Sequence, residues 1–215
     1  MNRPRLYVIG DSISIQYGPY LEQYLAGRFA YARKTAEAEA RFDLPQPMGD
    51  NGGDSSVVLA FLRGLIEAGE PDGNWTADLL LVNCGLHDIK TDPATGRKQV
   101  EIDDYRRNLQ EIVALAERAN IPLVWVRTTP CDEAVHNTRP DTAFYRFAAD
   151  CTAYNAVADA VMAAAGLPSI DLHNFTASLG SELFCDHVHF HDHIREKQAA
   201  YIAGWLEAYG VGRVV

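Results

Sequence analysis

Four histidines occur at every second position in the segment CDHVHFHDH, residues 185–193, close to the C-terminus. Alternate residues of an extended segment project to the same side, and imidazole and carboxylate groups gathered in this way could bind zinc. A binuclear metallohydrolase would need the pattern H-x-H-x-D-H, and the sequence HFHDH at 189–193 is one residue short of it. We therefore expect no metal site and no cofactor.

A second pattern in this segment, D-x-x-H, is formed by Asp186 and His189. In a turn, this spacing lets the carboxylate accept the Nδ1–H of the imidazole. Nε2 is then free to take a proton from a serine, as in a Ser-His-Asp triad. Of the four histidines, we assign only His189 to this chemistry. His187 is a candidate for the lining of the pocket, whereas His191 and His193 are expected to be structural or solvated.

The serine for such a triad is Ser12, which follows the apolar run RLYVIG at the start of an expected helix. A hydroxyl group there is exposed, and a helix N-terminus favours negative charge, so Ser12 can act as a nucleophile if a base reaches it. The alternative is a serine that only caps the helix, which is the commoner role. The nucleophile elbow G-x-S-x-G is absent from the chain, which disfavours an ordinary α/β-hydrolase.

Apolar runs alternate with helical patterns along the chain. Strands are expected at 5–10, 28–34, 78–85, 121–130 and 167–172, and helices at 16–27, 56–69, 103–120, 144–166 and 193–210. The segments 35–53 and 131–141 are expected to be loops, and Asp54, Ser55 or Ser56 could cap the second helix. This alternation predicts one α/β domain over residues 1–215, with a parallel sheet and right-handed crossovers.

Ligands of such sheets bind beyond the carboxyl ends of the strands. Four polar segments are expected at that rim: GDSIS (10–14), NGGDSS (51–56), GLHD (85–88) and the histidine segment 185–193.

In order and spacing, these four segments resemble the conserved blocks of the SGNH (GDSL-type) hydrolases, and the resemblance runs over nearly the whole chain. It implies a flavodoxin-like three-layer α/β/α sandwich with a central five-stranded parallel sheet. It also implies ester hydrolysis through an acyl-enzyme, with Ser12 as nucleophile, His189 as general base and acid, and Asp186 as the carboxylate that orients His189. The backbone N–H groups of Ser12 and Gly53 would belong to the oxyanion hole.

One block departs from the family pattern. The third block usually reads G-x-N-D, and its Asn side chain completes the oxyanion hole, but here the block reads GLHD and places His87 at that position. A neutral imidazole still carries one N–H, so His87 could replace the amide if its tautomer is held, and Asp88 could hold it. The alternative is a non-catalytic carbohydrate-binding or scaffold relative that has lost turnover.

Further candidates for substrate binding are Asp11, Asn51, His136, Asn137 and Arg139. The last three could bind hydroxyl groups or a carboxylate of the substrate, although ordinary loop polarity also accounts for them.

The substrates of the family include acetylated sugars, short-chain esters, lysophospholipids and thioesters. Because the chain shows no apolar lid and no amphipathic membrane segment, we expect a small, soluble, polar ester, such as an O-acetylated carbohydrate. A lysophospholipase or thioesterase is the alternative. A neutral base is required, so activity is expected to rise through roughly pH 6–7, near the reference histidine pKa of about 6.5.

Charge, hydropathy and cysteine spacing limit the binding partners and the cellular compartment that we expect. A net charge of −10 over 215 residues argues against nucleic acid and anionic membranes as partners. No apolar run approaches the roughly 20 residues that cross a bilayer. The N-terminus lacks a secretory pattern, so a cytoplasmic protein is expected; the alternative is a protein from which a signal peptide has been removed. The cysteines at 84, 131, 151 and 185 form no C-x-x-C pair, which favours reduced thiols.

Overall fold

The computed structural model describes residues 3–42, 44–68 and 76–210. Five strands form one sheet in which every neighbouring pair is parallel. Their order is β2-β1-β3-β4-β5. The strands are β1 (Arg5–Ile9), β2 (Ala30–Arg33), β3 (Leu79–Val82), β4 (Leu123–Val126) and β5 (Ser169–Ile170). This arrangement confirms the predicted five-stranded parallel sheet.

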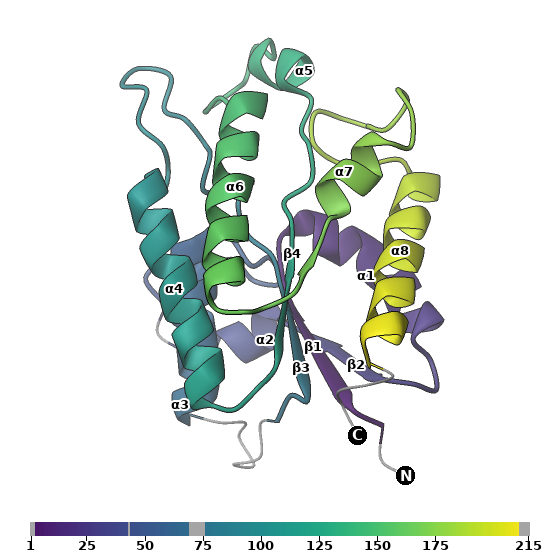
Figure 1. The fold of residues 1–215 in the computed structure, drawn as a ribbon. Coiled ribbons are helices and arrows are strands. Elements are labelled where there is room, and N and C mark those ends of the chain that lie inside the picture. The colour runs from purple at the N-terminus through teal and green to yellow at the C-terminus, as the bar shows by residue number, and fades with distance from the viewer. Residues whose placement is uncertain (1–2, 43, 69–75, 211–215) are drawn as a thin grey trace.

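Helices cover both faces of the sheet (Figure 1). They are α1 (Ser12–Tyr24), α2 (Ala36–Glu39), α3 (Ser55–Ala68), α4 (Ile102–Arg118), α5 (Glu133–Asn137), α6 (Ala148–Ala164), α7 (Leu172–Ala177) and α8 (Asp192–Gly210). On one face α4 packs between α3 and α6, and on the other α8 packs against α1 and α7. The predicted three-layer α/β/α architecture is therefore confirmed.

The central strand β3 and its neighbour β4 are buried along their whole length, as their continuous apolar runs predict. The flanking helix α4 buries one stripe of side chains, among them Tyr105, Leu109 and Ile112, and exposes the opposite side. Burial of these apolar side chains from both layers stabilises the sheet, and it leaves the ends of the strands as the place for polar groups.

The structure differs from the sequence prediction mainly where short helices interrupt expected loops. Helices α2 and α5 lie in the segments expected to be irregular, and α7 replaces the end of the last expected strand. Aspartates cap two of them, because Asp132 accepts the N–H of Val135 and Asp171 accepts the N–H of Asn174. Such one- or two-turn helices depend on caps rather than on an apolar stripe, so periodicity does not predict them.

The observed bounds of some helices also differ from the predicted ones. Helix α1 begins at Ser12 instead of residue 16, and α6 begins at Ala148 instead of residue 144. Helix α3 is capped by Asp54, whose Oδ1 accepts the N–H groups of Ser56 and Val57. Residue 69, the predicted end of this helix, lies outside the described residues.

Candidate active site

Strand β1 leads through Gly10 and Asp11 to Ser12, the first residue of α1. The buried Asp11 side chain caps this helix by accepting the N–H of Ile13 at 3.0 Å. Asp11 is therefore the cap, and the interpretation of Ser12 as the N-cap residue is wrong. The N–H of Ser12 finds no acceptor among the described residues, as is common in the first turn of a helix. Ser12 thus presents a hydroxyl group beside a free backbone donor.

His189 reaches this serine from the other end of the chain. Its Nε2 lies 2.9 Å from Ser12 Oγ, and its Nδ1 lies 2.7 Å from Asp186 Oδ2. The other carboxylate oxygen of Asp186 accepts the N–H groups of Val188 and His189 at 2.8 and 2.7 Å. Partial burial opposes ionisation of Asp186, but hydrogen bonds from His189 and Val188 outweigh it and lower the pKa of this carboxyl to about 2. Asp186 is therefore an anion that can orient and stabilise the imidazole.

The turn that carries Asp186 and His189 is fastened on both sides. Within the turn, the N–H of Cys185 donates to the carbonyl oxygen of His189 at 2.9 Å. Beyond the turn, Asp192 begins α8 and accepts the hydroxyl of Tyr20, on α1, at 2.7 Å. Because α1 also carries Ser12, this contact ties the two halves of the site to one pair of packed helices.

Ser12 and His189 open onto a cavity of about 290 Å³. Leu86, Val188 and His187 belong to its wall. A larger cavity of about 460 Å³ adjoins it. The two cavities share Lys90 and Phe144 in their walls, so the surface beside Ser12 continues well beyond the space that one short acyl group would fill.

The segment 51–53 supplies a second side of this cavity. The N–H of Gly53, expected to be free for the oxyanion hole, donates to Asn51 Oδ1 at 2.8 Å. Since a donor N–H requires an acceptor, this contact fixes which end of the Asn51 amide is oxygen. The Nδ2 group of Asn51 has no hydrogen-bond partner among the described residues, and Asn51 lines the cavity with Ser12. The free donor of this segment is therefore on Asn51.

A buried ion pair holds the backbone of this segment in place. Lys34 Nζ lies 2.7 Å from Glu39 Oε1, with both side chains almost fully buried. The same ammonium group donates to the carbonyl oxygens of Gly49 and Asn51, and Glu39 accepts the N–H of Gly49. Removing one member of such a pair typically costs about 3–5 kcal/mol, because the other charge is left buried and unpaired. The pair therefore keeps both of its members in place and positions the backbone at Asn51.

His87 lies in the turn after β3 and also lines the cavity. Burial lowers its pKa to about 3, and the nearby charges of Lys90 and Arg146 act in the same direction, so the imidazole is neutral. No described residue forms a hydrogen bond with its ring, which leaves an N–H available to a ligand. The expectation that Asp88 holds the tautomer is wrong, because Asp88 Oδ1 instead accepts the N–H of Ser55 at 2.9 Å.

Comparison with known proteins agrees with this geometry. The sequence profile of the GDSL-like Lipase/Acylhydrolase family matches residues 8–195, which include all four polar segments. The chain belongs to this family. Its members are carboxylic ester hydrolases, so the hydrolase class of the chain follows from the match. A search of curated proteins finds no match.

Solved structures similar to this hydrolase share its fold at low sequence identity. The acetyl xylan esterase AlAXEase has a TM-score of 0.65 at 14% identity, covering 94% of this chain and 99% of its own. A lipase/acylhydrolase from Enterococcus faecalis has a TM-score of 0.65 at 16% sequence identity, and the match covers 96% of each chain. Est24, a carbohydrate acetylesterase from Sinorhizobium meliloti, has a TM-score of 0.65 at 13% sequence identity, and the match covers 96% of this chain and 100% of its own.

The four alternating histidines of the hydrolase have separate surroundings. His189 contacts Ser12, whereas His187 Nδ1 lies 2.7 Å from Nδ1 of His136. His191 and His193 are exposed, and their rings stack on each other. In the part of the chain that the structure describes, no three or more His, Cys, Asp or Glu side chains are grouped to hold a metal ion.

The His136–His187 contact fixes the tautomers of both rings. Burial, with the charge of Arg146 adding to it, lowers the pKa of His136 to about 4, so this ring is neutral and carries one N–H. That N–H must be on Nε2, which lies 3.0 Å from the carbonyl oxygen of Phe144. Nδ1 of His136 is then an acceptor, and His187 donates to it from Nδ1. Burial also lowers the pKa of His187, so its Nε2 carries a lone pair at neutral pH.

The remaining candidates of this region have structural partners. Asn137 uses both ends of its amide on the backbone of Arg146, at 2.8 and 2.9 Å. Arg139 pairs with Asp141 at 3.1 Å and lines a small side cavity instead of the cavity at Ser12. Asp11, as described above, serves as a helix cap. Of the residues predicted to bind substrate, Asn51 and His187 are those with a free polar group in the wall of the cavity at Ser12.

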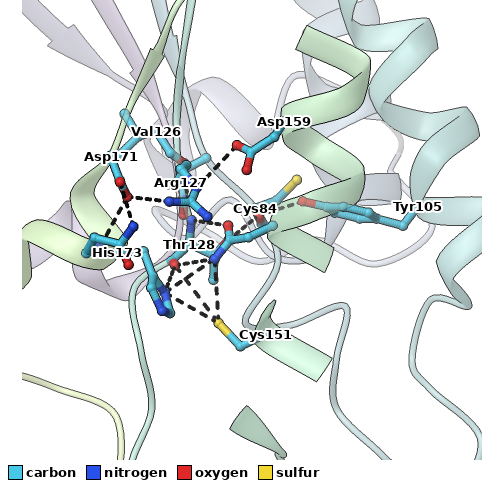
Figure 2. Close-up of polar contacts among 12 residues, drawn as sticks. Cys84, Tyr105, Val126, Arg127, Thr128, Cys151, Asp159, Asp171 and His173 are labelled. Carbon is cyan, nitrogen blue, oxygen red and sulfur yellow. Dashed lines mark hydrogen bonds and ion pairs between the residues drawn. The ribbon is translucent and has the colours of Figure 1, made fainter. Parts of the chain in front are cut away.

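A polar network joins the segments that follow β3 and β4 (Figure 2). The carbonyl oxygen of Cys84 accepts the hydroxyls of Thr128 and Tyr105 at 2.7 and 3.2 Å. Gly85 follows with φ +147°, and a Cβ at this position would lie 2.3 Å from Thr128 Oγ1, so no other residue fits. The network thus fixes the turn that carries His87.

The same network contains a cysteine near a histidine. Cys151 Sγ lies 3.9 Å from His173 Nδ1, which itself hydrogen-bonds to the carbonyl oxygen of Thr128 at 2.8 Å (Figure 2). Burial raises the pKa of the Cys151 thiol to about 12, so it stays protonated and is not a nucleophile. The four cysteines are free, and Cys84 is buried as predicted.

Three residues in the wall of the cavity at Ser12 lie outside the four predicted polar segments, and sequence reasoning missed them: Lys90, Phe144 and Arg146. The sequence predicts that Phe144 begins a helix, but this segment forms a bend followed by an isolated bridge between Tyr145 and Thr91. Only three-dimensional structure brings this segment beside Ser12, so no local pattern in the sequence indicates it.

Proposed function

We propose that the protein is a serine esterase that acts through an acyl-enzyme. One observation carries this proposal: the relay from Asp186 through His189 to Ser12, with distances of 2.7 and 2.9 Å, at the wall of an open cavity. With Nδ1–H held by the carboxylate, Nε2 of His189 carries the lone pair that accepts the serine proton.

In the proposed reaction, Ser12 Oγ attacks the ester carbonyl carbon while His189 takes the hydroxyl proton. The tetrahedral intermediate collapses as the bond to the leaving alkoxide breaks, and His189 returns the proton to that oxygen. A water molecule then gives a proton to His189 and attacks the acyl carbon. Departure of Ser12, reprotonated by His189, releases the acid. The net reaction consumes one ester and one water and yields one acid and one alcohol.

The negative charge of the intermediate needs donors close to Ser12. We assign this role to the free N–H of Ser12, the neutral imidazole of His87 and the Nδ2 group of Asn51. Each of them lies at the cavity without a partner in the described residues. Gly53, the donor expected from the family pattern, supports Asn51 in this proposal by holding its amide oxygen. Loss of one such donor typically costs about 10²–10³ in rate.

For the substrate we propose an O-acetylated carbohydrate or a similar polyol ester. A cavity of about 290 Å³ suits a short acyl group, and the lone pair on His187 Nε2 suits a substrate hydroxyl. Two of the similar structures are described as an acetyl xylan esterase and a carbohydrate acetylesterase. No helix among the described residues is long and apolar enough to cross a bilayer.

The test combines a nucleophile variant with a panel of substrates. Wild-type protein should hydrolyse p-nitrophenyl acetate faster than longer acyl esters and should release acetate from acetylated xylan or acetylated sugars. A fluorophosphonate probe should label wild-type protein but not Ser12→Ala, and that variant should lose turnover. Turnover that survives Ser12→Ala would refute the mechanism, and a preference for long acyl chains would favour a lysophospholipase or thioesterase.

A further inference from the structure

Arg146 is a buried cation in the wall of the cavity at Ser12. Its residue is only 5% exposed, and its Nε donates to the carbonyl oxygen of Leu86 at 2.8 Å. Asn137 holds its backbone N–H and carbonyl groups, so the position of the residue is fixed on both sides. The guanidinium group therefore does not depend on a ligand for its placement.

The two Nη groups of Arg146 have no hydrogen-bond partner in the described part of the chain. No described carboxylate lies within ion-pair distance of them either. The carboxylates of Asp11 and Asp186 act on Arg146 from beyond that distance, and both already have other roles: Asp11 caps α1, and Asp186 orients His189. A buried charge without a counter-ion is costly, and a structural arginine is normally paired.

Lys90 is a second cation at the same place. It lines both the cavity at Ser12 and the larger neighbouring one, and its Nζ has no hydrogen bond or ion pair with a described residue. Both cations lie against one ring, since Lys90 Nζ and Arg146 Cζ are each 4.9 Å from the centre of Phe144. Partial burial lowers the pKa of Lys90, and the nearby charge of Arg146 acts in the same direction.

Other cations near the two cavities are neutralised. In the wall of the larger cavity, Lys98 pairs with Asp150, and Arg97 lies 4.0 Å from Glu101. In the side cavity, Arg139 pairs with Asp141. Among the described residues in the walls of these two cavities, the cations without an acidic partner are therefore Arg146 and Lys90, although the chain as a whole carries a net charge of −10.

We propose that Arg146 and Lys90 form an anion subsite and that the ester hydrolysed at Ser12 carries a carboxylate or phosphate group that binds there. This inference rests on the proposed esterase function and specifies its substrate class. The planar Nη pair of Arg146 suits two oxygens of one anionic group, and Lys90 adds a point charge. Phe144, between the two cations, offers a flat apolar surface for the carbon skeleton that joins the anion to the ester.

A matched set of acetyl esters tests the subsite: 4-acetoxybenzoate, 4-acetoxyphenyl phosphate and the neutral methyl 4-acetoxybenzoate, with released acetate as the common readout. For each protein, the ratio of kcat/KM for an anionic ester to that for the neutral ester is measured. Dividing the ratio of a variant by that of the wild type removes the intrinsic reactivity of the esters. The carboxylate and phosphate arms show which anion the subsite prefers.

Arg146→Met and Lys90→Met should each lower this ratio by about 10- to 100-fold, the loss expected for a charge-assisted contact. Arg63→Met removes the same charge from an exposed position on α3, where Arg63 pairs with Glu111, and should leave the ratio unchanged. If Arg146→Met does not fold, Lys90→Met and Arg146→Lys decide the question. Unchanged ratios in folded Arg146→Met and Lys90→Met would overturn the proposal. A ratio that is lowered by Arg139→Met but by neither of these two variants would also overturn it.

Binding without turnover separates this inference from the esterase proposal. Ser12→Ala should bind 4-acetoxybenzoate more tightly than the methyl ester in calorimetric titration, and addition of Lys90→Met should remove the difference. If the wild type hydrolyses none of the esters but Ser12→Ala keeps this preference, the esterase proposal fails while the anion subsite stands. Equal affinity of Ser12→Ala for both esters would refute the subsite even in an active esterase.

Discussion

The Nε2 atom of His189 lies 2.9 Å from the Oγ atom of Ser12, although the two residues are 177 positions apart in the chain. Packing of α8 against α1 brings them together, and the hydrogen bond from Tyr20 to Asp192 joins the same two helices near the site. The reactive contact is therefore a consequence of tertiary structure, and its chemistry can be altered without disturbing the packing that creates it.

Asp186→Asn should inactivate the protein without unfolding it. The amide keeps an oxygen for the N–H groups of Val188 and His189, but it offers His189 Nδ1 an N–H instead of a carboxylate. His189 then carries its proton on Nε2 and cannot accept one from Ser12. We expect kcat to fall by about 10²–10⁴-fold on p-nitrophenyl acetate.

Asp103→Asn is the matched control, because it makes the same chemical change at an exposed position on α4. It should change kcat by less than threefold, and both variants should keep the circular dichroism spectrum of the wild type. A kcat for Asp186→Asn close to that of the control would remove Asp186 from the relay.

His87→Ala should lower kcat by about 10²–10³-fold if the imidazole donates to the oxyanion. His87→Asn should keep much of the activity, because an amide supplies the N–H that the family pattern places here. Since the pKa of His87 is about 3, its protonation cannot shape the pH–rate profile above about pH 5. The measurement is kcat over pH 5–9 for both variants, and equal activity of His87→Ala and wild type would place His87 outside the oxyanion hole.

Asn51→Asp separates the two donors of segment 51–53. Aspartate can still accept the N–H of Gly53, but it has no N–H of its own, and it brings a negative charge to the oxyanion. We expect a loss of at least about 10²-fold in kcat for Asn51→Asp and a similar loss for Asn51→Ala. Activity of Asn51→Ala at or above the wild-type level would instead assign the donor role to the N–H of Gly53, which that substitution frees.

The parts of this protein that the sequence predicts well are those that depend on local pattern. The apolar runs of β3 and β4 and the amphipathic stripe of α4 define the sheet and its cover, and the D-x-x-H spacing predicts the contact of Asp186 with His189. These features need only neighbours a few residues apart, or a periodicity that one strand or helix contains.

The features that sequence reasoning missed depend on contacts between distant segments. Asn51 takes the N–H of Gly53 because the ion pair of Lys34 and Glu39 holds the loop in that shape, and neither member of the pair belongs to a motif. Arg146 lies in the wall of the cavity at Ser12, and the side chain of Asn137, nine residues away in the chain, holds its backbone. Asn137 itself was predicted to bind substrate, which shows that polar residue type alone does not distinguish a ligand contact from a structural one.

The pH dependence of stability should reveal the buried Asp88. Its Oδ1 accepts the N–H of Ser55, whereas its Oδ2 has no partner among the described residues. Burial raises the pKa of this carboxyl to about 7, against hydrogen bonding by Ser55. The folded protein therefore keeps a proton that the unfolded chain, with a carboxyl pKa of about 3.9, loses. Its contribution to stability is full below about pH 4 and is lost as the pH rises to 7.

Asp88→Asn keeps an acceptor for Ser55 and removes the titration. In urea denaturation, its free energy of unfolding relative to the wild type should increase from pH 5 to about pH 7 and level off by pH 8. Asp92→Asn is the control, because hydrogen bonds from the backbone of Thr95 and Ala94 lower the pKa of the exposed Asp92, which is ionised throughout this range. A difference between Asp88→Asn and wild type that stays constant with pH would show that Asp88 is already ionised in the folded protein at pH 5, and that Ser55 outweighs the cost of its burial.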